Sequence, residues 1–302
     1  MKMNDKTKSA VFALSAALIW GIAFAFQRMG AERLGPLSFN ACRGVLATLA
    51  LWLLTLVRSR SGIAAYPTGE GRRFWLGGLL CGVLLWAGSN LQQYGLSETE
   101  AGAAGFLTSL YIVLVPLLEV IVLRRRVPAL LWVSVLLALS GLYLLSVGEG
   151  FSVRPTDAVI MLSALVFAVH ILAVDRFVKD ADPVALCCVQ FAVVTALSAA
   201  GAAIWEHPSW ADIKSVAPSL LYVGVVSGGL GYASQMAAQK YGKPETVSLL
   251  CSMESLFSVL GGAVILSERL TLRELAGCAV MFCAVLLSQM PENLFAKKAK
   301  TR

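Results

Sequence analysis

The sequence predicts an all-α membrane protein with ten transmembrane helices, arranged as two inverted repeats of five helices each. Ten apolar stretches follow one another along the 302 residues. Apolar residues make up 58% of the chain, charged residues only 14%, and the mean hydropathy is +0.74, which is far from the composition of a soluble globular domain. Shifting residues 100–126 by 143 positions places Tyr111 on Glu254 and Ala101 on Pro244, so the second half repeats the first.

Each expected span holds roughly 20 mostly apolar residues, the length that crosses a hydrocarbon core of about 30 Å. In the first half the spans are 8–27, 36–57, 73–95, 101–123 and 128–147. In the second half they are 156–176, 184–205, 217–240, 245–266 and 271–290. The connections are too short for a soluble domain. We therefore assign residues 1–150 to the first repeat, and residues 151–302 to the second repeat with a short basic tail.

Lysine and arginine residues border these spans on alternate sides. Such residues are retained in the cytoplasm, so their distribution predicts the orientation. With the N-terminus inside, 18 of the 25 lie in inner segments: before the first span, after the second, fourth, sixth and eighth, and after the tenth. Only six lie in outer segments, and Arg43 lies within a span. We expect a multi-pass protein of the bacterial inner membrane with both termini cytoplasmic. The net charge of +7 reflects this asymmetry and does not indicate nucleic-acid binding.

Several functional classes are disfavoured by the sequence. The seven cysteines and the two histidines, His170 and His207, have none of the spacings that bind zinc. The G-x-x-x-x-G-K-[ST] motif of nucleotide-powered pumps is missing. A membrane-embedded enzyme would need clustered carboxylates or histidines at a membrane face, and the sequence has no such cluster. We therefore expect no metal, no cofactor and no enzymatic activity.

A series of short motifs in both halves resembles the drug/metabolite transporter superfamily, EamA type. In the first half they are Trp20-Gly21, Pro36 followed by Arg43, Gln92-Gln93-Tyr94-Gly95, and Ala101 to Pro116 through Tyr111. In the second half they are Leu162-Ser163-Ala164, Pro183 followed by Gln190, Gln239, Glu254, and Glu268-Arg269-Leu270. The resemblance covers residues 9–290 and implies a ten-helix basket that works by alternating access. It also implies a central substrate cavity lined mainly by helices 1, 3, 4, 6, 8 and 9, to which Trp20 and Tyr111 would contribute.

One residue departs from the family pattern. The helix 9 glutamate is often followed by proline in the family, whereas Ser255 follows Glu254 in this chain. Proline removes a helical hydrogen bond and kinks a span. Helix 4 keeps such a proline at Pro116, whereas a bend in helix 9 would have to lie at Gly261-Gly262. We therefore expect the two halves to flex at different places.

Glu254 is the leading candidate for substrate or proton binding. It lies about ten residues into the ninth span, near the membrane midplane, where a buried ionisable group usually marks a substrate or proton path. A structural, hydrogen-bonded carboxyl is the alternative. Glu119 is a weaker candidate of the same kind, because it lies five residues before Arg124 and can snorkel toward the cytoplasmic interface or pair there. Arg43 could recruit an anion or pair with an outer carboxylate such as Glu32. His170 could bind substrate or relay protons, or be a core residue.

Two polar and aromatic stripes at helical spacing are further candidates for a cavity wall. The third span carries Trp86, Asn90, Gln93 and Tyr94, and the eighth carries Tyr232, Gln235 and Gln239 after Gly228. The alternative is that the amides join helices to one another. Small-residue pairs at 78/82 and 224/228 could seat a homodimer or pack within one chain, so monomer and homodimer both remain open.

These patterns together predict a secondary-active transporter of small organic metabolites, with export of amino acids or related compounds as the leading case by resemblance. Its expected partners are a small-molecule substrate, membrane lipid, and a proton or another coupling ion. Uptake of a small cationic or polar solute is the main alternative. A membrane-embedded enzyme and a passive pore are less favoured. The substrate, the direction of transport and the coupling ion do not follow from the sequence.

Overall fold

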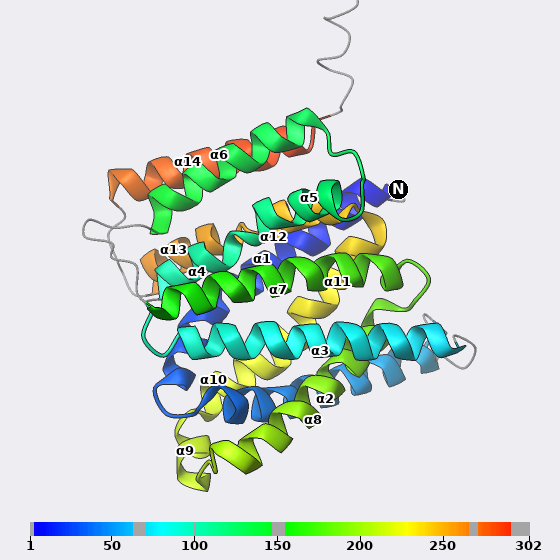
Figure 1. Ribbon diagram of the computed structural model, residues 1–302, viewed down its shortest axis with the longest axis vertical. Coiled ribbons are helices and arrows are strands. Elements are labelled where there is room, and N and C mark those ends of the chain that lie inside the picture. The colour runs from blue at the N-terminus through cyan, green and yellow to red at the C-terminus, as the bar shows by residue number, and fades with distance from the viewer. Residues whose placement is uncertain (1–2, 63–70, 100, 147–154, 266–270, 291–302) are drawn as a thin grey trace, which may run out of the picture.

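The computed structural model describes residues 3–62, 71–99, 101–146, 155–265 and 271–290, and these residues form helices and no strands (Figure 1). The first half contains α1 (Asp5–Ala31), α2 (Pro36–Arg60), α3 (Gly71–Gly95), α4 (Ala101–Ser109), α5 (Tyr111–Ile121) and α6 (Ala129–Ser146). The second half contains α7 (Pro155–Val178), α8 (Pro183–Trp205), α9 (Trp210–Ser215), α10 (Ala217–Leu221), the π-helix η1 (Tyr222–Gly231), α11 (Tyr232–Tyr241), α12 (Pro244–Cys251), α13 (Glu254–Ile265) and α14 (Leu272–Ser288).

The all-α membrane fold class is confirmed. Six helices in the described part of the chain are long and apolar enough to cross a membrane, namely α1, α2, α3, the broken helix over Ala103–Ile121, α7 and α8. The stretch Ala129–Leu145 is apolar but shorter. Helices cover the other expected spans as well, in shorter or broken pieces. The number of ten spans therefore stays a prediction.

Local sequence signals explain where several helices begin. Prolines occupy the first turns of α2, α8 and α12, where a missing N–H breaks no helical hydrogen bond. The Asp182 carboxylate accepts hydrogen bonds from the backbone N–H groups of Val184 and Ala185, at 3.0 and 3.1 Å, and so caps α8. Thr271 and Glu274 form a reciprocal capping box at the start of α14. These caps satisfy backbone donors that would otherwise lack partners.

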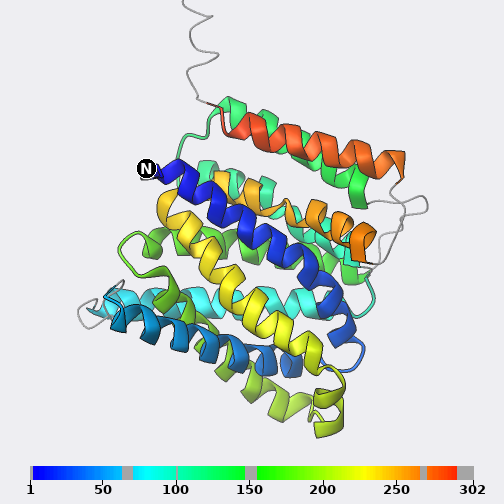
Figure 2. The same ribbon diagram turned by 180° about the vertical axis from the view of Figure 1, so that it is seen from behind.

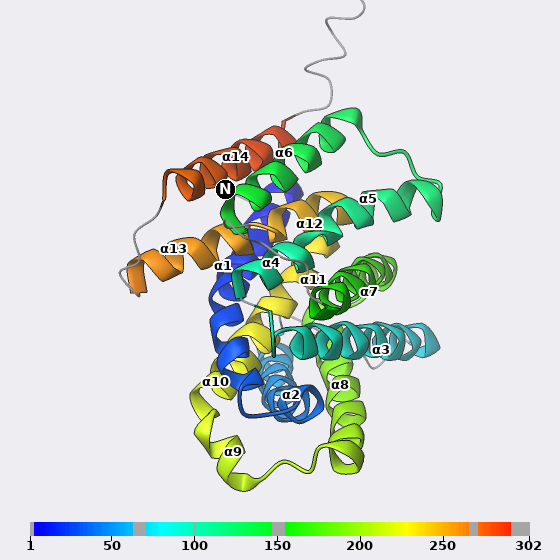
Figure 3. The same cartoon turned by 60° about the vertical axis from the view of Figure 1, so that its left-hand side comes forward.

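The helices form a group of central elements between two outer pairs (Figures 1 and 3). At one end of the long axis α6 packs against α14, and at the other end α2 packs against α8. In each outer pair one helix comes from the first half and the other from the second. Between them lie α1, α3, α4, α5, α7, η1 and α11 to α13. Figure 2 shows α1 beside η1 and α11, which it contacts.

The beginning of α1 and the end of α14 lie at the same side of the molecule. The Lys6 ammonium donates a hydrogen bond to the backbone carbonyl of Gln289, just after α14. This is the arrangement that an even number of crossings produces. Several residues used in the orientation argument, including the tail at 297–302, the segment 148–154 and Glu268-Arg269-Leu270, lie outside the described residues.

Both broken helices of the centre are interrupted at equivalent places. In the first half Leu110 separates α4 from α5, and its N–H bonds to the carbonyl of Leu107, three residues back. In the second half residues 252–253 separate α12 from α13, and the Met253 N–H bonds to Leu250 in the same way. Such i→i−3 bonds tighten a turn and redirect the helix that follows.

The helices are therefore broken at equivalent places in the two halves, whereas the expectation that the halves flex at different places stays a prediction. The breaks are related by the same offset of 143 positions that separates Tyr111 from Glu254. Helix α5 continues through Pro116, and α13 continues through Gly261-Gly262. The tight turn precedes each of these residues, because a 3₁₀-type turn needs neither a proline nor a glycine. Tyr111 and Glu254 consequently occupy the first positions of α5 and α13.

The small-residue pairs pack within the chain. A β-carbon at Gly78 would lie 2.5 Å from Val189 of α8, and one at Gly82 would lie 2.7 Å from Val193. In the second half, one at Gly224 would lie 2.7 Å from Leu46 and one at Gly228 would lie 2.9 Å from Ala47, both on α2. The glycines therefore allow the close approach of α3 to α8 and of η1 to α2. This confirms the intramolecular interpretation of both motifs.

Candidate functional site

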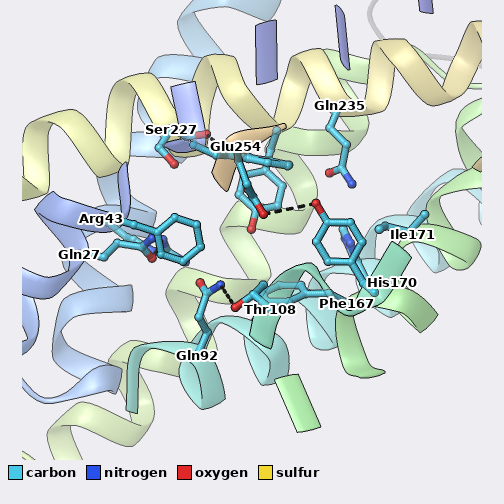
Figure 4. Close-up of a pocket in the computed structure, with 14 residues that line it drawn as sticks. Gln27, Arg43, Gln92, Thr108, Phe167, His170, Ile171, Ser227, Gln235 and Glu254 are labelled. Atoms are coloured by element: carbon cyan, nitrogen blue, oxygen red, sulfur yellow. Dashed lines mark hydrogen bonds between the residues drawn. The ribbon is translucent and has the colours of Figure 1, made fainter. Parts of the chain in front are cut away.

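A small cavity lies among the central helices, close to both breaks (Figure 4). Its volume is about 50 Å³, which is room for a few water molecules. Side chains from α1, α2, α3, α4, α5, α7, η1, α11 and α13 surround it. The lining residues are Trp20, Phe24, Gln27, Arg43, Gln92, Thr108, Tyr111, Phe167, His170, Ile171, Ser227, Tyr232, Gln235 and Glu254.

The negative side of this cavity is the Glu254 carboxylate, which is 3% exposed. The Tyr111 hydroxyl donates a hydrogen bond to its Oε1 atom at 3.3 Å, and the Ser109 hydroxyl donates to the same atom at 3.4 Å. Figure 4 marks the first of these hydrogen bonds with a dashed line that ends at the Glu254 carboxylate. Because both partners stand at helix breaks, the equivalent positions of the two halves meet inside one site.

The positive side of the cavity is Arg43 of α2, which is also 3% exposed. Its guanidinium donates a hydrogen bond to the side-chain oxygen of Gln27 at 3.3 Å, and its buried Nε atom has no hydrogen-bond partner. The sequence-based alternative that Arg43 pairs with Glu32 is wrong, because Arg43 points into the cavity toward Gln27. Within the described residues, neither Arg43 nor Glu254 takes part in a salt bridge.

Aromatic side chains form the apolar wall. The rings of Trp20 and Tyr232 pack with centroids 4.8 Å apart at 60°, and Tyr232 also packs edge-on against Phe191 at 5.3 Å. Such tilted arrangements are favourable for aromatic pairs. The Trp20 indole N–H donates to the backbone carbonyl of Ser227 in η1 at 3.4 Å. Tyr232 lines the same cavity as Arg43 and Glu254.

His170 lines the cavity from α7 and is 1% exposed. Its Nε2 atom is 2.9 Å from the side-chain oxygen of Gln190 on α8. A neutral imidazole whose Nε2 carries the proton would make this hydrogen bond. Gln190 occupies in the second half the position that Arg43 occupies in the first, so the two equivalent positions serve the site differently.

The four residues predicted as a cavity stripe on α3 lie in different surroundings. Asn90 donates to the Trp86 carbonyl at 2.8 Å, Gln93 donates to the Gln27 carbonyl at 2.9 Å, and Trp86 packs against the core between α3, α7 and α8. None of these three lines the cavity. The prediction for Tyr94 is wrong, because its side chain is 53% exposed and points out of the bundle. Four residues at spacings of four, three and one cover too wide an arc for one narrow cavity.

The stripe on α11 is closer to the prediction. Tyr232 and Gln235 line the cavity, and the buried side-chain oxygen of Gln235 has no hydrogen-bond partner. Gln239, one turn further, instead donates to the backbone carbonyl of Ile171 at 2.7 Å and joins α11 to α7. It does not line the cavity, so helix joining, the alternative interpretation, describes Gln239.

Several lining residues were missed by the sequence analysis. Gln92, the neighbour of a predicted residue, faces the cavity and donates to the Thr108 hydroxyl at 3.1 Å. Helical spacing of polar and aromatic residues, which predicted the stripes on α3 and α11, also occurs on α1. There it links Trp20, Phe24 and Gln27 at spacings of four and three, so the same pattern predicts Gln27 in the cavity wall. The other missed lining residues are Thr108, Phe167, Ile171 and Ser227.

Two further expectations concern ionisable groups outside the cavity. Glu119 accepts a hydrogen bond from Arg125 at 3.3 Å, so the predicted pairing near the helix end is confirmed. Within the described residues, no group of three or more His, Cys, Asp or Glu side chains is placed to hold a metal ion.

Comparisons with known proteins give one consistent result. A model of the EamA-like transporter family matches residues 7–147 and again residues 154–290. An uncharacterized transporter of Archaeoglobus fulgidus is 27% identical over 271 residues, which are 90% of this chain and 82% of that protein. A solved crystal structure is similar with a TM-score of 0.76 over 98% of this chain and 99% of its own, at 17% identity. At that identity the likeness concerns the fold alone.

Proposed function

Because the chain belongs to the EamA-like transporter family, and is therefore a membrane transporter, we propose that it is a secondary-active exporter of amino acids or related small metabolites. Alternating access to the cavity beside the two helix breaks is the proposed mechanism. Export is the direction that the resemblance to EamA-type transporters favours. A bacterial inner membrane with both termini cytoplasmic is the proposed setting, and residue 150 the proposed boundary between the repeats.

One observation carries the choice of substrate: two opposite charges are buried in the same cavity without a salt bridge between them. An unpaired buried charge is costly, so each of them gains from a ligand of opposite sign. Arg43 retains an unsatisfied Nε donor, and Gln235 an unsatisfied acceptor oxygen. An amino acid carries one carboxylate for Arg43 and one ammonium for Glu254 and Gln235. The aromatic wall would receive its side chain.

The alternative, uptake of a cationic solute, draws on Glu254 alone. Arg43 disfavours it, because a second positive charge in a cavity of low dielectric repels a ligand that lacks a carboxylate. The cavity volume of about 50 Å³ is also too small for an amino acid in this conformation. Binding then requires the surrounding helices to separate, which the two breaks beside the cavity would permit.

The proposal can be tested by counterflow in liposomes, with three related solutes. The solutes are one zwitterionic amino acid, the amine that lacks its carboxylate, and the acid that lacks its amino group. We expect saturable exchange that prefers the zwitterion. Arg43→Gln should lose the preference over the amine, and Glu254→Gln the preference over the acid. Each loss should be about tenfold or more, because a charged hydrogen bond contributes about 1.5–3 kcal/mol.

Controls separate loss of recognition from loss of folding. Glu32→Gln removes an exposed carboxylate and should leave exchange unchanged, and monodisperse yield should be measured for every variant. Preference of the wild type for the amine would favour the cationic alternative. Exchange that does not saturate would indicate a passive pore.

The proposed orientation has its own test in cells. A cysteine at Ser61, between α2 and α3, should be protected from an impermeant thiol reagent, whereas one at Ser97, between α3 and α4, should react. Both positions are exposed, so protection would reflect the membrane. The reverse labelling pattern would overturn the orientation.

A further inference from the structure

A second and larger cavity lies at the side of the molecule where α1 begins and α14 ends. Its volume is about 450 Å³, against about 50 Å³ for the central cavity, and sites for small organic ligands commonly enclose about 300–1,000 Å³. Its walls come from the beginnings of α1 and α6, the segment that leads from α11 into α12, and the end of α14. We call it the end cavity. It lies between an outer pair of helices and the central group.

Charged groups of both signs line the end cavity. Lys6 and Lys243 are exposed side chains, whereas the Glu245 side chain is only 4% exposed. Lys6 donates a hydrogen bond to the backbone carbonyl of Gln289, which is a neutral acceptor. Within the described residues, neither Lys6 nor Glu245 takes part in a salt bridge. Because a buried carboxylate is costly without a partner of opposite charge, Glu245 gains from a ligand that carries a cation.

An apolar surface leads out of the end cavity along α14. Leu131 and Leu250 are buried residues of the wall, whereas Met290 lines the wall and is 43% exposed. Phe282 and Leu286 precede Met290 at intervals of four residues, so these three side chains lie on one helical face. Phe282 and Leu286 are 55% and 50% exposed. Exposed apolar side chains in such a row, on a membrane protein, are a surface for lipid acyl chains.

The end cavity also lies at the level of the lipid headgroups. Helix α1 is long and apolar enough to cross a membrane, and it begins at this cavity. The Lys8 ammonium nitrogen lies 4.7 Å from the ring centroid of Tyr241, which lines the cavity. Lysine and tyrosine side chains gather where the ends of spans meet the headgroups. Lipid phosphates therefore lie at the level of Lys6 and Lys243.

We propose that the end cavity binds one phospholipid whose headgroup carries both a phosphate and a primary ammonium, which is the ethanolamine class. The phosphate contacts the ammonium groups of Lys6 and Lys243, and the headgroup ammonium donates hydrogen bonds to the Glu245 carboxylate. An acyl chain follows Phe282, Leu286 and Met290. Because the walls come from the outer pair and from the central group, the bound lipid joins α6 and α14 to α1 and α12. This assignment holds whatever solute the central cavity binds.

Thermal unfolding of lipid-depleted protein in detergent tests the proposal, because a ligand of the native state raises the unfolding temperature. The probes are phosphatidylethanolamine, phosphatidylglycerol with the same acyl chains, and water-soluble phosphoethanolamine. Phosphatidylethanolamine should give a saturable rise, with an apparent affinity about tenfold above that of phosphatidylglycerol, because only the first offers Glu245 a cationic donor. Phosphoethanolamine at the same concentration should give no rise, because it has no acyl chain to bury. Native mass spectrometry should count one retained lipid.

Variants assign the two halves of the headgroup to their partners. Glu245→Gln should lose the preference for phosphatidylethanolamine over phosphatidylglycerol. Lys6→Gln combined with Lys243→Gln should weaken the binding of both lipids about tenfold, because both keep the phosphate. Glu32→Gln and Lys214→Gln change exposed side chains that do not line the end cavity, and they should match the wild type.

Three results would overturn the proposal. The first is equal affinity of the wild type for the two lipids, and this comparison needs no variant to fold. The second is a preference for phosphatidylethanolamine that survives in Glu245→Gln. The third is an equal rise with phosphoethanolamine, which would show that the site binds the soluble headgroup and not a lipid. Because no transported solute is used, failure of the proposed substrate would not change these results.

Discussion

The two broken helices meet each other twice, and the two contacts differ in chemistry. Toward the side where α1 begins, α5 contacts α12, and Arg125, just after α5, joins the buried Glu119 to Asp175 of α7. Toward the other side, α4 carries no charged residue, and its Ser109 hydroxyl contacts Glu254 and Ser255 of α13. There the hydroxyl oxygens of Ser109 and Ser255 are 3.4 Å apart.

The difference shows how one pair of equivalent helices can be held by unlike forces. Buried charges are costly to separate from their partners, so the ion pairs of Arg125 with Glu119 and Asp175 resist movement of α5 away from α7. The α4–α13 contact is held by long hydroxyl contacts of 3.4 Å, which contribute less, so separating these two helices should cost less free energy. We therefore expect the two sides of the cavity to open by different means. The following substitutions test this contrast.

The largest effect is expected from Arg125→Ala. This change removes the donor shared by Glu119 and Asp175 and leaves two largely buried carboxylates without it. The free energy of unfolding should fall by about 2–3 kcal/mol, because each hydrogen bond to a charged group contributes about 1.5–3 kcal/mol and Arg125 is half exposed to solvent. Thermal unfolding in detergent measures it. Arg126→Ala, an exposed neighbour, should change little, and equal losses in both variants would argue against the network.

A smaller loss should follow Gly21→Ala on α1. An added β-carbon would lie 2.6 Å from the Glu254 backbone carbonyl of α13, so α1 and α13 must move apart at a cost of about 2 kcal/mol. The matched change Gly105→Ala on α4 meets only Ser255 at 3.7 Å and Phe24 at 4.0 Å. It should be neutral or slightly stabilising, because alanine favours helix. Thermal unfolding of both variants measures the difference, and equal stability would contradict the α1–α13 contact.

Tyr111→Phe should lower the free energy of unfolding by about 1 kcal/mol. Its effect on solute exchange should be larger than its effect on folding. The substitution deletes the hydroxyl that donates to Glu254 at 3.3 Å and keeps the ring. Yield and unfolding temperature should change slightly, while the affinity for solute falls as the carboxylate loses its orientation. Tyr143→Phe, on a half-exposed ring of α6, serves as the control. Unchanged affinity would show that Glu254 is positioned without the tyrosine.

The smallest effect is expected from Ser255→Ala. The hydroxyl contact with Ser109 is long, at 3.4 Å. Its loss should therefore lower the free energy of unfolding by at most about 0.5 kcal/mol. A loss as large as that of Arg125→Ala, measured in the same thermal assay, would remove the contrast between the two contacts.

Much of the fold could be predicted because hydropathy and proline positions act locally. The apolar stretches became helices, and Pro36, Pro183 and Pro244 stand at helix starts. The prediction of Glu254 as a buried carboxyl followed from its depth in an apolar segment, and its burial is observed. Tyr94 shows the limit of this reasoning, since periodicity describes one helix and cannot say how much of its face a neighbour covers.

What the sequence by itself determined is the class of protein: an all-helical membrane chain whose halves repeat, with a carboxylate deep in the ninth stretch. Only the tertiary structure decided that Arg43 and Glu254 share a cavity, that Tyr111 meets Glu254, and that Arg125 joins Glu119 to Asp175. Local energies set where helices form, because apolar residues and backbone hydrogen bonds act over a few positions. Which side chains face each other depends on helix crossings and tight turns, and these are settled only when all the helices pack together.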